Sequence, residues 1–84
     1  MKEQDLLELG FEIRHAYAHE TGYDEDFYYY RYTFAQHLQL LSSSSDEVKN
    51  NEWFVEFFDI QADIRFTNAN DVNKLIILIE GAKK

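Results

Sequence analysis

The spacing of apolar residues changes along the chain and predicts several strands between two helices. In the middle of the chain large apolar residues alternate with polar ones, a period of two that is typical of β-strands. Near the C-terminus the period becomes that of a helix, because Val72, Leu75, Ile76 and Ile79 lie at positions i, i+3, i+4 and i+7. The predicted elements are a helix over residues 2–9, strands over 11–18, 27–35, 38–41, 53–60 and 64–67, and a helix that begins after Asn68 or Asn70.

Residues 11–18 fit two patterns. As a strand, they would place four larger side chains on one face: Phe11, Ile13, His15 and Tyr17. As a continuation of the first helix, they would extend a stripe that consists of Leu6, Leu9, Ile13 and Tyr17. Gly10 favours the strand, because glycine commonly adopts the left-handed conformation that ends a helix.

Residues 27–34 carry six aromatic rings in eight positions and are the most constrained strand of the chain. Successive strand residues point to opposite faces of a sheet. One face therefore carries Phe27, Tyr29, Arg31 and Thr33, and the other carries Tyr28, Tyr30, Tyr32 and Phe34. The C-terminal helix can cover only one of these faces, so the other would still display aromatic rings.

The order of helix, strands and helix predicts a single α+β domain over residues 1–84 (αββββ(β)α). The connections are too short for crossover helices, so we expect an antiparallel sheet of four to five strands. The C-terminal amphipathic helix is expected to cover one face and to end at Gly81. Residues 42–51, which begin with four serines, are expected to form a polar, mobile loop.

Composition and charge narrow the classes of function. The chain has 84 residues and no cysteine, so the rings that make up 17% of it are the expected source of stability, together with association. The net charge of −8 disfavours direct binding to nucleic acids or anionic membranes and favours a basic partner. Most of the acidity lies in residues 1–26 (eight acids, two bases) and 46–63 (six acids, one base).

Candidate catalytic and metal-binding residues are few. His15 and His19 form an H-x-x-x-H pair, but on a strand they would lie about 13 Å apart, too far for one zinc ion. The carboxylates of Glu12 and of residues 20–26 surround a predicted turn, where hydration keeps them from the raised pKa that acid–base catalysis requires. Phosphate-binding glycine loops and nucleophile motifs are absent from the sequence. We therefore expect no enzyme, no metal and no cofactor.

Acidic and aromatic residues are the candidates for partner binding. Tyrosine is enriched at protein interfaces, and carboxylates on a small scaffold can imitate the phosphates of a nucleic acid in a basic groove. The predicted contact residues are Glu20, Asp24, Glu25, Asp26, Tyr28, Tyr30, Tyr32, Asp46, Glu47, Glu52 and Glu56. The alternatives are tyrosine rings packed beneath a helix, with their hydroxyls at the rim, and an acidic surface that only keeps the protein in solution.

Three segments carry a resemblance to other sequences: residues 6–11 (LLELGF), 53–59 (WFVEFFD) and 64–69 (IRFTNA). They resemble segments of small uncharacterised proteins from bacterial genomes and their phages, and the similarity covers most of the chain. Its motifs are structural, so it implies an α+β fold and neither an activity nor functional residues. In being small, acidic and cysteine-free, the chain also resembles phage inhibitors of bacterial defence, of the anti-CRISPR type.

These observations predict a non-enzymatic protein–protein interaction module, and more specifically an acidic inhibitor of a nucleic-acid-handling or defence enzyme. The alternative is a structural or accessory homodimer with no external ligand. The first residues do not form a signal peptide, and the longest apolar run, residues 75–79, is far too short for a membrane span. We expect a cytoplasmic protein, in the host cytoplasm if it is encoded by a phage.

Overall fold

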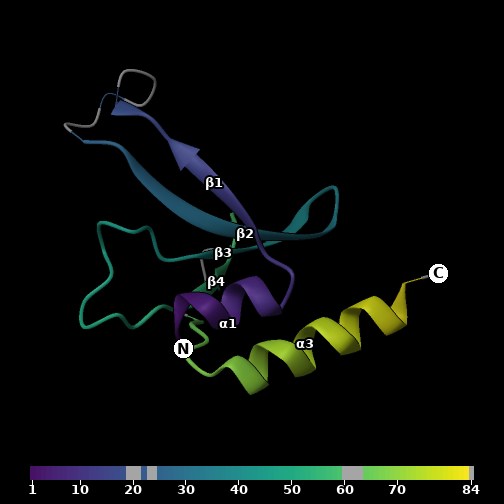
Figure 1. The fold of residues 1–84 in the computed structure, drawn as a ribbon. Helices are drawn as coiled ribbons and strands as arrows, with labels where there is room; N and C mark the ends of the chain where they lie inside the picture. Colours follow the sequence, from purple (N-terminus) through teal and green to yellow (C-terminus); the bar gives the residue numbers. More distant parts are fainter. Residues whose placement is uncertain (19–21, 23–24, 60–63, 84) are drawn as a thin grey trace.

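A computed structural model describes residues 1–18, 22, 25–59 and 64–83. Four antiparallel strands pair in the order β1-β2-β3-β4, and helices α1 and α3 lie on the same side of the sheet (Figure 1). The elements are α1 (Glu3–Glu8), β1 (Glu12–Ala16), β2 (Phe27–Ala35), β3 (Leu38–Ser42), β4 (Val55–Phe57) and α3 (Ala69–Ala82). The predicted α+β class, with a short N-terminal helix, an antiparallel sheet and a C-terminal helix, is confirmed. No helix in the described part of the chain is long and apolar enough to cross a membrane.

Gly10 separates α1 from β1. Its φ of 95° lies in the left-handed region that glycine adopts without steric cost. The strand interpretation of this part of the chain is therefore confirmed over Glu12–Ala16, and the rival continuation of the helix is wrong.

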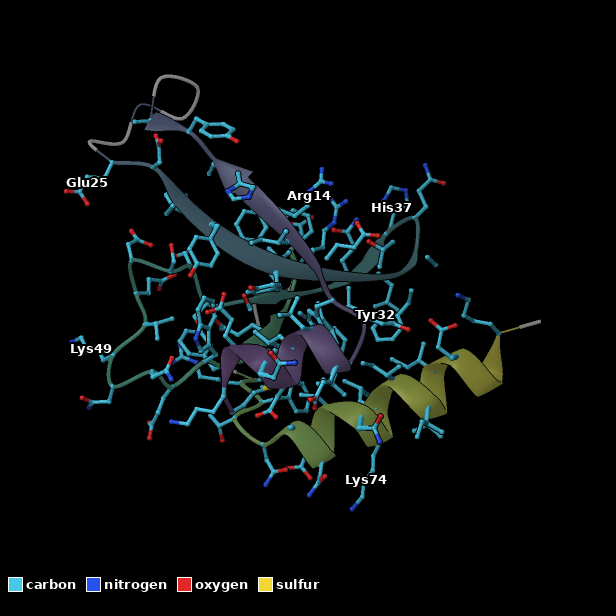
Figure 2. All side chains as sticks on the ribbon, in the orientation of Figure 1. Arg14, Glu25, Tyr32, His37, Lys49 and Lys74 are labelled. Carbon is cyan, nitrogen blue, oxygen red and sulfur yellow. The ribbon has the colours of Figure 1, made fainter. Side chains whose placement is uncertain are left out.

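Strand β2 separates the core of the molecule from its open side. Tyr30 and Phe34 are only 2% and 3% exposed, and Tyr32 packs against the same core. Figure 2 shows Tyr32 on the side of the sheet that faces α3, and Arg14 on the opposite side. The buried core comprises Leu6, Phe11, Tyr30, Phe34, Leu40, Trp53, Val55, Val72 and Ile76. The helices therefore cover the even-numbered face of β2 and leave the odd-numbered face uncovered.

Helix α3 has the predicted apolar stripe and the predicted first cap. Val72 and Ile76 are buried in the core. The side chain of Asn68 accepts a hydrogen bond of 2.8 Å from the backbone N–H of Asn70, which satisfies one of the free N–H groups of the first turn. The prediction that Gly81 ends the helix is wrong: α3 continues through Gly81 to Ala82, so this glycine lies inside the last turn.

The chain after residue 52 forms less strand than predicted. The predicted start of the fourth strand at Trp53 is wrong, because the N–H of Trp53 donates to the carbonyl of Met1 (2.8 Å) and not to a strand neighbour. At the other end β4 stops at Phe57, since Asp59 adopts a φ of 61° in a turn. The predicted fifth strand is also wrong. Phe66 forms only an isolated bridge with Val55, two residues before the Asn68 cap of α3.

Candidate functional site

The serine run after β3 attaches the following loop to β2. The N–H of Tyr28 donates to the hydroxyl of Ser45 (3.0 Å), and the N–H of Ser45 donates back to the carbonyl of Tyr28 (2.7 Å). The N–H of Tyr30 donates in the same way to the hydroxyl of Ser42 (2.9 Å). Ser42 belongs to β3 and Ser43 is 2% exposed, so the serines supply hydrogen-bond partners where β3 no longer runs beside β2. The predicted mobility of residues 42–51 stays a prediction.

This attachment brings two acidic segments to one end of the sheet. Asp46 follows Ser45 directly, and Asp26 directly precedes β2, two positions before Tyr28. Figure 2 shows Glu25 and the loop that carries Lys49 at the same side of the molecule. We call this group the acidic end; it comprises Glu25, Asp26, Asp46 and Glu47.

The four carboxylates of the acidic end differ in their contacts. Asp26 accepts a hydrogen bond of 2.7 Å from the N–H of Ala18. Glu47 accepts hydrogen bonds from both the N–H (3.2 Å) and the hydroxyl (2.5 Å) of Ser44. Glu25 and Asp46 are exposed and have neither a hydrogen bond nor an ion pair within the described residues. The first two acids hold the local backbone, and the last two are available for a partner.

The other acids predicted to bind a partner lie elsewhere. Glu52 is exposed and forms a backbone bridge with Lys49 in the same loop. Glu56 lies on β4 and forms an ion pair with Arg65 (3.7 Å), so the structure does not bring it to the acidic end. The remaining two predicted acids, Glu20 and Asp24, lie outside the described residues.

The three predicted contact tyrosines lie on the helix-covered face. Tyr30 is 2% exposed and its hydroxyl donates a short hydrogen bond to Glu3, so this fold leaves its ring almost no surface for a partner, and the predicted contact stays a prediction. Tyr32 is half-buried and its hydroxyl donates to Glu80 of α3 (3.2 Å). Tyr28 packs against Trp53, with 6.0 Å between the ring centroids. The alternative expectation, in which the rings pack beneath helices with hydroxyls at the rim, describes their placement.

The buried tyrosines predict that the protein loses stability in alkaline solution. Burial, with the Glu3 carboxylate as a second cause, raises the pKa of Tyr30 above its ordinary value of 10.0. The folded state therefore keeps a proton that the unfolded state loses, so this stabilisation is complete below about pH 10 and falls as the pH rises further. Urea denaturation between pH 8 and pH 11.5 should show that the free energy of unfolding falls as the pH rises. Tyr30 should steepen this fall by up to about 1.4 kcal/mol per pH unit.

The variant Tyr30→Phe is the control for this pH dependence, because it keeps the ring and removes the titrating hydroxyl. Its decline above pH 10 should be shallower than that of the unmodified protein. Burial also raises the pKa of Tyr28 and Tyr32, so a part of the decline should remain. Equal slopes for the two proteins would contradict the prediction for Tyr30.

The second candidate surface is the side of the sheet that the helices leave uncovered. Paired strand residues share a face, so the register of the sheet defines this surface. We call it the open face; it comprises Glu12, Arg14, Phe27, Tyr29, Arg31, Thr33, Gln39, Leu41 and Glu56. A hollow of about 290 Å³ lies on it and is lined by Phe27, Tyr29, Leu41, Ser42, Ser44 and Glu47. The hollow adjoins the acidic end through Glu47.

All three arginines of the chain gather at the open face. Arg65 reaches it from the segment before α3, pairs with Glu56, and lies 3.8 Å from the ring centroid of Phe54. Arg14 and Arg31 have no ion pair within the described residues. The alternation along β2 predicts which residues share its odd-numbered face, but it predicts neither that this face stays uncovered nor that Arg14 and Leu41 lie on it.

The fold and its two surfaces define a small α+β domain with an acidic end and an open, arginine-containing sheet face. Within the described residues, no group of three or more His, Cys, Asp or Glu side chains could hold a metal ion. Comparison with protein-family models, with curated proteins and with solved structures finds no match. The resemblance to small bacterial and phage proteins therefore stays a prediction.

Proposed function

We propose that the protein is a non-enzymatic protein–protein interaction module of the cytoplasm, whose acidic end occupies a basic surface on another protein. One observation carries this proposal. The pairing of Ser45 with Tyr28 brings carboxylates that are about twenty positions apart in the sequence to one end of the sheet. Two of them, Glu25 and Asp46, are exposed and bind nothing else in the described chain.

The partner that fits this end best is an enzyme that handles nucleic acids. Such enzymes bind phosphates through grooves rich in lysine and arginine, and carboxylates gathered at one end of the sheet offer negative charge like that of the phosphates. The net charge of −8 would also accelerate association with a basic groove. We therefore propose an inhibitor that blocks such a groove, with a defence nuclease as the preferred class of partner.

The double variant E25Q/D46N tests the proposed function. It removes the two available charges and leaves Asp26 and Glu47, which hold the backbone. The partner is first captured from a lysate of the source cell and identified by mass spectrometry, and its Kd is then measured by calorimetry at 50 and 300 mM salt. We expect the double variant to bind at least tenfold more weakly, and the unmodified protein to lose affinity as the salt concentration rises.

The matched control is the variant E8Q/D71N, which makes the same change of net charge at exposed positions on α1 and before the core stripe of α3. Its affinity should stay within about twofold of the unmodified protein. A single-stranded or duplex DNA should also compete with the protein for its partner. Unchanged affinity in E25Q/D46N, or a partner that binds both protein and DNA at once, would contradict the proposal.

A further inference from the structure

The open face has an apolar centre that helices α1 and α3 do not cover. Phe27, Tyr29 and Leu41 line the hollow of about 290 Å³, and all three are only partly buried. Helices α1 and α3 lie on the opposite side of the sheet, so neither of them covers these side chains (Figure 1). A contiguous apolar surface of this kind, bordered by charged residues, is typical of an interaction site.

The charges around the apolar centre are balanced, unlike those of the rest of the protein. Two arginines, Arg14 and Arg31, and two acids, Glu12 and Glu47, surround the apolar centre. None of the four forms an ion pair within the described residues. Glu47 lines the hollow next to the open face, and the second acid of the open face itself, Glu56, forms an ion pair with Arg65. The net charge of −8 therefore lies outside the open face. A strongly basic or strongly acidic partner would match only half of these charges.

Arg14 and Glu47 lie on different sides of the hollow, whereas Glu12 is the cross-strand neighbour of Arg31 on the β1–β2 side. Arg14 is the cross-strand neighbour of Tyr29, and Arg31 is the cross-strand neighbour of Leu41, so both cations adjoin the hollow from β1 and β2. Glu47 lines the hollow from the loop after β3. A two-fold rotation about an axis through the hollow would bring the arginines of one copy toward the Glu47 side of the other, with the apolar centres in contact.

We propose that the open face is the contact surface between two copies of this chain, which form a two-fold symmetric dimer. A self-complementary surface is what an isologous interface requires, because each copy presents the same residues to the other. The dimer would also add buried apolar surface to a chain of 84 residues that has no disulfide. Glu47 belongs to both surfaces, but Glu25 and Asp46, on which the proposed function rests, are not among the residues that line the hollow, so different substitutions test the two proposals.

Exchange of charges between two variants tests the dimer. In R14E/R31E all four charges become negative, and in E12K/E47K all four become positive, so each variant should repel a second copy of itself. Sedimentation equilibrium at 150 mM salt should show a self-association Kd raised at least tenfold for each variant alone. An equimolar mixture should form a heterodimer that native mass spectrometry identifies by its mass, because opposite charges then face one another.

Three controls keep this result unambiguous. The variant K49E/K74E reaches the same net charge as R14E/R31E through residues outside the open face, and it should remain dimeric. Leu41→Glu should dissociate the dimer, whereas Ile13→Glu, on the other face of β1, should not. Circular dichroism of each variant confirms that it is folded.

The proposal is overturned if the unmodified protein is monomeric at 100 µM, or if R14E/R31E remains dimeric. It is also overturned if the mixture of folded variants forms no heterodimer. Loss of the dimer in Ile13→Glu together with its retention in Leu41→Glu would place the contact at the β1 edge and would likewise reject the open face. Binding of the captured partner by R14E/R31E, together with loss of the dimer, would separate this surface from the acidic end.

Discussion

Replacing Leu6 by alanine is expected to lower the free energy of unfolding by about 2–5 kcal/mol, whereas Leu7→Ala should lower it by less than about 1 kcal/mol. The two leucines are neighbours in α1 and chemically identical, but Leu6 is 0% exposed and Leu7 is 48% exposed. Truncation of Leu6 removes contacts with the core and leaves a cavity between α1 and the sheet. Truncation of Leu7 removes mainly a contact with solvent.

The loss at Leu6 is large relative to the total stability of the domain. A chain of 84 residues is expected to have a free energy of unfolding of about 4–13 kcal/mol. Leu6→Ala should therefore lower Tm by at least about 8 °C and unfold a marginally stable protein. Urea denaturation followed by the fluorescence of Trp53, the single tryptophan, measures both variants in the same way. Equal losses at Leu6 and Leu7 would show that α1 is not anchored through one face.

Elements with a strong local pattern could be predicted from the sequence. The bounds of β2 agree with the prediction at both ends, because the run of aromatic residues between polar segments fits only a strand. The apolar stripe of α3 and its Asn68 cap were also predicted, since both depend on residues less than two turns apart. Gly81 did not end the helix, because a glycine near a C-terminus can remain in the last turn.

Contacts between distant segments could not be predicted in this way. The alternation of residues along β2 gives two faces, but only the position of α1 and α3 determines that Tyr30 is buried and Tyr29 is not. Residues 64–67 have a strand-like pattern, yet only Phe66 finds a strand partner. A period describes which side chains share a face, and it does not say which other segment covers that face.

The candidate surfaces could not be predicted for the same reason, because they also depend on contacts between segments that are distant in the sequence. Nothing in the sequence around Ser45 indicates that its hydroxyl and backbone pair with Tyr28, and this pairing is what joins the two acidic segments. The gathering of the arginines depends likewise on strand register, since Arg14 and Arg31 belong to different strands. Charge counts along the chain identified acidic segments but missed a balanced, arginine-containing face within an acidic protein.

The two surfaces are compatible with one assembly. The open face would join two copies, and each copy would keep its own exposed acids, Glu25 and Asp46, outside the hollow. Such a dimer would present two acidic ends to a partner that has two basic sites. Binding would then gain from effective concentration when both ends engage together.

Removal of the Trp53 ring is expected to lower the free energy of unfolding more than removal of any other ring. A phenylalanine at this position should retain most of the stabilisation. Trp53 is 3% exposed and packs edge-on against Tyr30 (5.6 Å between ring centroids), with Tyr28 on another side (6.0 Å). Trp53→Ala removes these contacts and should lower the free energy of unfolding by about 3–5 kcal/mol. Urea denaturation followed by far-ultraviolet circular dichroism measures this loss without the tryptophan.

Trp53→Phe should lower the free energy of unfolding by less than half as much as Trp53→Ala. The buried indole Nε1 of Trp53 has no hydrogen-bond partner within the described residues. Leaving such a group buried costs about 1–3 kcal/mol, and phenylalanine removes this cost while it keeps an aromatic ring against Tyr30. The smaller ring loses some packing, which the relief of the unpaired N–H partly offsets. If Trp53→Phe were as destabilising as Trp53→Ala, the indole N–H would have to be stabilising the fold, and the burial of an unpaired donor would be the wrong description of this site.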